Sequence, residues 1–133
     1  MQLLDHHFQP KVLALVHTLA LGWVTMIILG AAYQLIPVIF EQDLYSPKLA
    51  FLSYLLLTLG TCLLLHCFWQ FEIGKVMIFA GSLIVISALL YFYILYQTIK
   101  NKNNAIELNI FFLFSAFWFC FTTIAGLLLT INL

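Results

Sequence analysis

Two histidines stand out among the side chains that could bind a metal or a cofactor. His17 lies a few residues inside a long uncharged segment that follows Lys11, and His66 lies a few residues before the end of the next such segment. If both segments are helices that run antiparallel, the two imidazoles lie at similar height, because a helix rises about 1.5 Å per residue. Neutral imidazole is the commonest biological metal ligand. His17 and His66 could therefore hold one heme iron from both sides.

Each histidine also has an interpretation without a ligand, in which a backbone carbonyl, a threonine or water satisfies the ring. For His17 we favour the ligand, since an ionisable side chain inside a membrane is usually functional. For His66 we favour the structural role, because Phe68, Trp69 and Gln70 border it and could bring it into contact with water.

The remaining metal-binding side chains give weaker signals. His6 and His7 could join His17 and His66 in a metal cluster, although solvated surface histidines are the more common case. Three thiols, Cys62, Cys67 and Cys120, are too dispersed to form a disulfide framework, and we expect them to be buried and inert.

The composition shows where these side chains must lie. Hydrophobic residues make up 65% of the chain and charged residues only 8%, whereas a soluble domain is about a quarter charged. The net charge is zero and no basic cluster exists, which disfavours a nucleic-acid partner. The sequence therefore excludes a soluble enzyme and predicts an integral membrane protein whose main surroundings are the lipid bilayer.

Four uncharged segments separate the ten charged residues. Each has at least 23 residues, and about 20 helical residues span the hydrocarbon core. We predict helices over about 12–40, 49–71, 76–99 and 108–131. Because the loops between them are short, consecutive helices should pack antiparallel. The expected fold is a single all-α transmembrane domain, an antiparallel four-helix bundle formed by residues 1–133.

The lysines give the expected orientation. With four spans, Lys11 and Lys75 lie on the side of the termini, and Lys48, Lys100 and Lys102 lie on the other side. Cytoplasmic loops carry the excess of positive charge. The termini are therefore expected outside the cytoplasm.

Small residues on the first predicted helix could make room for a flat cofactor. Gly22 and Gly30 are spaced by eight residues and share a face with Ala14 and Thr18. Small residues let two helices, or a helix and a ligand, approach closely. Cofactor binding and ordinary helix packing explain this stripe about equally well.

The segment from His17 to Leu65 resembles the second and third transmembrane helices of heme–copper oxidase subunit I and of bacterial subunit-I-like membrane proteins. The pattern is H-x-x-x-L-G-[FW]-x-T-M-x-x-x-G-x-x-Y-Q-L-x-P-V. In this sequence it is matched by His17, Leu21-Gly22-Trp23, Thr25-Met26, Gly30 and Tyr33-Gln34-Leu35-Ile36-Pro37-Val38.

The resemblance implies that His17 corresponds to an axial ligand of a low-spin heme on the outer side of a bacterial inner (cytoplasmic) membrane. It places no family ligand at His66. Subunit I has many more helices, and its copper and high-spin heme motifs are absent here, so this chain is not expected to be an oxidase on its own.

The sequence thus predicts a b-type heme-binding subunit with an electron-transfer or accessory role in a respiratory complex. It would work as a homodimer or within a larger membrane complex, with a redox partner protein. Either His66 or a histidine of another chain would supply the second ligand. Two alternatives stay open. One is a non-catalytic scaffold that has lost the cofactor, and the other is a metal-handling assembly protein that uses His6, His7 and His17.

Overall fold

The computed structural model describes residues 10–70, 74–100 and 106–132, and four long apolar helices run through them. The first helix consists of three consecutive segments, which are α1 (Pro10–His17), the π-helix η1 (Thr18–Thr25) and α2 (Met26–Phe40). It is followed by α3 (Pro47–Gln70), α4 (Lys75–Ile99) and α5 (Ile106–Ile131). These bounds lie within two residues of the predicted ones.

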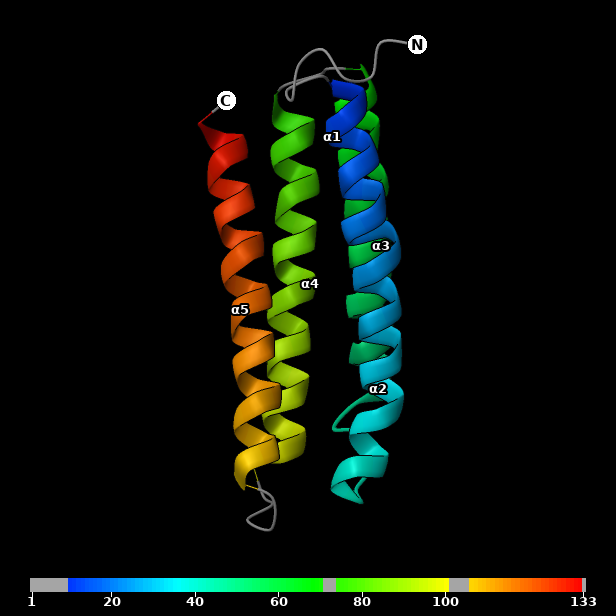
Figure 1. Cartoon of the computed structure of the whole chain (residues 1–133), viewed down its shortest axis with the longest axis vertical. Helices are drawn as coiled ribbons and strands as arrows, with labels where there is room; N and C mark the ends of the chain where they lie inside the picture. Colours follow the sequence, from blue (N-terminus) through cyan, green and yellow to red (C-terminus); the bar gives the residue numbers. More distant parts are fainter. Residues whose placement is uncertain (1–9, 71–73, 101–105, 133) are drawn as a thin grey trace.

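The helices run alternately up and down, so that the start of α1 and the end of α5 lie at the same end of the molecule (Figure 1). α3 packs on α4, α4 packs on α5, and the first helix packs against α3. All four helices are long and apolar enough to cross a membrane. The predicted fold class, an all-α membrane helical bundle, is confirmed.

Proline and a left-handed residue define the connection between α2 and α3. Pro37 lies inside α2, and the helix ends at Phe40; the next residue, Glu41, caps it with a left-handed φ of 48°. The Pro37 carbonyl accepts hydrogen bonds from the amides of Glu41 and Gln42. Pro47 then opens α3, where its missing N–H has no helical partner to lose.

The loop between α2 and α3 is fixed to the end of α4. The side chain of Gln42 donates to the Thr98 carbonyl, and the amide of Tyr45 donates to Thr98 Oγ1 at 3.1 Å. These two hydrogen bonds hold the C-terminal end of α2 close to the C-terminal end of α4.

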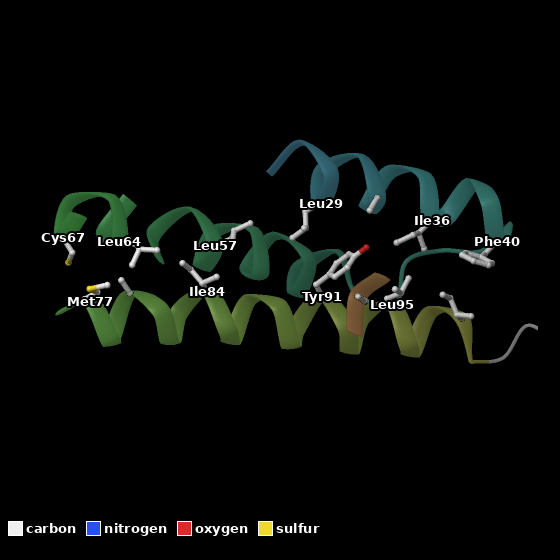
Figure 2. Close-up of a cluster of buried hydrophobic side chains, with 14 residues drawn as sticks. Leu29, Ile36, Phe40, Leu57, Leu64, Cys67, Met77, Ile84, Tyr91 and Leu95 are labelled. Atoms are coloured by element: carbon white, nitrogen blue, oxygen red, sulfur yellow. The ribbon is translucent and has the colours of Figure 1, made fainter. Parts of the chain in front are cut away.

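The core lies mainly between α3 and α4, with α2 covering one end of it (Figure 2). Gly60 allows α3 and α4 to approach, because a Cβ at this position would lie 2.8 Å from Ile84 Cγ1 and 3.0 Å from the Ala80 carbonyl. Polar bonds also cross this interface, since the buried Ser87 hydroxyl of α4 donates to the Ser53 carbonyl of α3 at 2.6 Å.

The π-helix is the feature of the first helix that the sequence did not indicate. It begins directly after His17 and covers eight residues. The Thr25 hydroxyl donates to the carbonyl of Ala20, five residues earlier. Segments of π-helix are rare and frequently lie at functional sites.

Candidate cofactor site

A cavity of about 580 Å³ lies between the first helix and α5, with residues of α3 and α4 completing its wall. Its volume falls within the range of about 300–1,000 Å³ that is usual for small-molecule and cofactor sites. The residues that line it are Leu13, His17, Ala20, Leu21 and Thr25 of the first helix; Leu64, Cys67 and Phe68 of α3; Met77, Gly81 and Ile84 of α4; and Phe119, Thr122, Thr123, Gly126, Leu127, Leu129 and Thr130 of α5.

His17 brings a nitrogen ligand to this cavity in a defined orientation. Its Nδ1 lies 2.8 Å from the Leu13 carbonyl, and a carbonyl can only accept, so Nδ1 carries the proton. In the neutral ring Nε2 then keeps its lone pair. None of the described residues forms a hydrogen bond with Nε2. Histidines that bind metals usually have their second nitrogen bonded in this way.

A phenyl ring from α3 packs against His17. The ring centroids of His17 and Phe68 are 4.7 Å apart, and their planes are inclined by 52°. Phe68 also lines the cavity. The imidazole is therefore held by the Leu13 carbonyl on its own helix and by an aromatic side chain from the neighbouring helix.

Aliphatic and aromatic side chains dominate the cavity, and the hydroxyls in its wall come from four threonines. Each of these hydroxyls donates to a carbonyl of its own helix, and the four residues are Thr25, Thr122, Thr123 and Thr130. No charged side chain is among the described lining residues. The wall therefore suits a flat, largely apolar ligand. Among the described lining residues, His17 is the one whose side chain has a nitrogen that could bind a metal.

The structure separates the predicted site residues from one another. Of the four, only His17 lines the cavity. His66 is exposed on α3. Gly22 instead faces α3, where a Cβ would lie 3.8 Å from Thr61 Cγ2. Gly30 lines a different groove at the other end of the first helix.

Two side chains with sulfur line the cavity and were not predicted to belong to a site. Met77 is only 3% exposed, and Cys67 is buried next to it in the core (Figure 2). Cys67 follows His66 directly, so one step along α3 separates an exposed histidine from a buried thiol. The wall supplied by α5 was also not predicted.

The expectation that all three thiols are buried is wrong for Cys62. Cys67 and Cys120 are buried, but Cys62 is exposed because its position on α3 is not covered by another part of the described structure.

Two members of the predicted metal cluster, His6 and His7, lie outside the described residues. Among residues 10–70, 74–100 and 106–132, no three His, Cys, Asp or Glu side chains come together as a metal site would require.

A comparison with known proteins shows similarity to a respiratory oxidase subunit. Over 64 residues the chain is 36% identical to the cbb3-type cytochrome c oxidase subunit CcoN1 of Stutzerimonas stutzeri. The aligned part is 47% of this chain but only 14% of that protein. No protein-family model and no solved structure matches. The finding supports a distant relation to a subunit of this kind, within a bacterial membrane.

Proposed function

We propose that this chain binds a b-type heme through His17 in the cavity between the first helix and α5, and that it serves electron transfer or an accessory role in a bacterial respiratory membrane complex. The observation that carries the proposal is the orientation of His17, whose Nδ1 is bonded to the Leu13 carbonyl while Nε2 is left to a ligand. The similarity to a cytochrome oxidase subunit supports the same cofactor class.

The residues of the cavity fit such a group. His17 Nε2 would bind the heme iron, and the Leu13 carbonyl and Phe68 would fix the plane of the imidazole. The apolar wall would exclude water, and Gly81 and Gly126 add no side-chain bulk to it. A bound heme would supply one-electron redox chemistry, whose potential depends on the axial ligands and on burial.

The second ligand of the iron could come from this chain, through His66 or Met77, or from another chain. Because His66 is exposed and does not line the cavity, its use would require α3 to turn about its axis. Met77 already lines the cavity. The other source is a histidine of another chain, in a homodimer or a larger membrane complex with a redox partner protein.

The test is the absorption spectrum of the protein, purified in detergent from heme-replete cells and recorded oxidised and dithionite-reduced. The wild type should show a reduced b-type α-band, and His17→Ala should lose it. His66→Ala is the matched control, because it removes an exposed histidine outside the cavity. A colourless wild type, or a band that His17→Ala leaves intact, would contradict the proposal.

A variant of Met77 then distinguishes Met77 from a histidine of another chain as the second ligand. Met77→Leu keeps a side chain of similar volume and removes the sulfur. If Met77 is the ligand, this variant keeps heme but changes from a low-spin to a high-spin spectrum. If another chain supplies the ligand, Met77→Leu keeps the low-spin spectrum, and the heme content depends on the oligomeric state.

A non-catalytic scaffold subunit is the second candidate function. It is favoured by the first helix and α5, which expose large apolar side chains along most of their lengths and could pack against other membrane subunits. A wild type that co-purifies with membrane proteins but contains neither heme nor metal would support this alternative. Stoichiometric metal that disappears on changing His6 and His7 would instead support the metal-handling protein.

A further inference from the structure

We infer that a second groove, at the opposite end of the molecule from His17, binds the primary ammonium of a phosphatidylethanolamine head group. The groove lies between the C-terminal half of α2, the loop that follows it, and the start of α3. It has a volume of about 670 Å³ and is lined by Gly30, Tyr33, Gln34, Pro37, Asp43, Leu44, Pro47 and Ala50.

The charged group in the groove is a carboxylate without a countercharge. Asp43 lines the groove and is exposed. Among the described residues, no ion pair joins Asp43 to a basic side chain. A carboxylate at the boundary of a membrane attracts a cation.

Tyr33 adds a hydrogen-bond acceptor. The Ser53 hydroxyl donates its proton to the Ala50 carbonyl at 2.9 Å. In the hydrogen bond between Tyr33 Oη and Ser53 Oγ, the Tyr33 hydroxyl must therefore be the donor. The lone pairs of Tyr33 Oη remain available to a ligand. The Gln34 side chain supplies an amide oxygen at the same groove.

Hydroxyl, amide and carboxylate oxygens come from three of the residues that line the groove, Tyr33, Gln34 and Asp43. Together they suit a cation that carries several N–H donors.

The position of the groove favours a lipid as the source of that cation. Gly30 lies ten residues before the end of α2, which corresponds to about 15 Å along the helix. Asp43 lies in the loop outside it. A ligand that fills the groove therefore extends from the boundary into the hydrocarbon region, as a phospholipid does.

Lys48 extends the match to the lipid phosphate. It is exposed and follows Pro47, which lines the groove. A lysine at this position can meet the phosphate while Asp43 meets the ammonium. Phosphatidylcholine offers the same phosphate, but its quaternary ammonium has no N–H, so the acceptors of the groove should favour phosphatidylethanolamine.

The experiment measures the lipid retained by the full chain after reconstitution in nanodiscs that contain equal amounts of the two lipids, using native mass spectrometry. We expect wild type to retain phosphatidylethanolamine over phosphatidylcholine by about tenfold, which corresponds to one charge-assisted hydrogen bond. Asp43→Asn should bring the ratio close to that of the bulk lipid. Tyr33→Phe should lower it less.

Glu41→Gln is the matched control, because Glu41 is an exposed carboxylate two residues away that does not line the groove. It should retain the wild-type ratio. Equal retention of both lipids by wild type, or equal effects of the Asp43 and Glu41 variants, would overturn the inference. Thermal stabilisation by free ethanolamine, without any preference between the lipids, would overturn the assignment to a lipid.

Discussion

At Gly60 a single hydrogen atom in place of a side chain lets α3 and α4 approach each other. Gly60→Ala would place Cβ against Ile84 Cγ1 and the Ala80 carbonyl, and a backbone carbonyl cannot move away alone. We expect a loss of about 1–3 kcal/mol in the free energy of unfolding, as for other overpacked cores. Reversible unfolding in mixed micelles with increasing SDS, followed by circular dichroism, would measure it.

Gly126→Ala is the comparison for Gly60, since no heavy atom lies within 4 Å of a Cβ built at Gly126. This change should leave stability unaltered or raise it slightly, because alanine has the higher helix propensity. Equal losses at both glycines would show that packing between α3 and α4 is looser than the structure indicates.

The contribution of one hydrogen bond between α3 and α4 can be measured with a variant of Ser87. Its hydroxyl donates to the Ser53 carbonyl across the interface between α3 and α4, and such bonds in membranes contribute about 0.6 kcal/mol and at most about 1.7 kcal/mol. Ser87→Ala should lower the free energy of unfolding by that amount in the same assay. Ser82→Ala should not, because Ser82 donates to the Phe79 carbonyl of its own helix.

Residue types alone identified His17 as a candidate ligand but could not identify its surroundings. A histidine in an apolar segment is visible in the sequence, whereas the Leu13 carbonyl and the Phe68 ring that orient it are not. His66 gave the same signal and proved to be exposed. In an all-apolar helix, lipid-facing and core-facing positions have the same composition, so the sequence cannot distinguish them.

At the scale of elements, the π-helix sets how His17 is turned relative to the rest of the first helix. Inserting one alanine after Leu19, an exposed residue of η1, adds a second extra residue beside the one that the widened turn already holds. Residues before the insertion would then rotate by about 100° relative to α2, since each residue of an α-helix turns by that angle. His17 would turn out of the cavity, and the b-type absorption band should be lost.

Leu19→Ala controls for the insertion, because it keeps the number of residues and removes only lipid-facing bulk. It should keep the absorption band. Circular dichroism of both variants should show retained helix content. If the insertion variant still binds heme like the wild type, the orientation set by η1 is not required for the site.

The limits of the helices were predictable, but their internal geometry was not. The ten charges and Pro47 set the ends of the four spans within two residues. The change from α to π geometry at Thr18 has no marker in the sequence, since residues Thr18–Thr25 contain neither a proline nor a charged residue. The contribution of α5 to the cavity depends on tertiary packing, which the sequence of α5 does not encode locally.

At the scale of the whole molecule, the lysine distribution predicts the orientation. The termini should lie outside, with the loop at 41–46 and Lys100 inside. Alkaline phosphatase fused after the last helix should be active in the periplasm, and green fluorescent protein fused there should be dark. The same reporters fused after truncation in the 41–46 loop should show the reverse. The opposite pattern would place the proposed heme on the cytoplasmic side.

The attachment of the first helix mainly to α3 has a consequence for biogenesis. The ribosome delivers the first helix to the bilayer before α3 exists, although α3 is its principal packing partner. During that interval lipids surround the first helix, and the His17 side chain is in contact with them. The α5 wall of the cavity is synthesised last. Synthesis therefore leaves His17 accessible to the proposed heme until α5 is inserted.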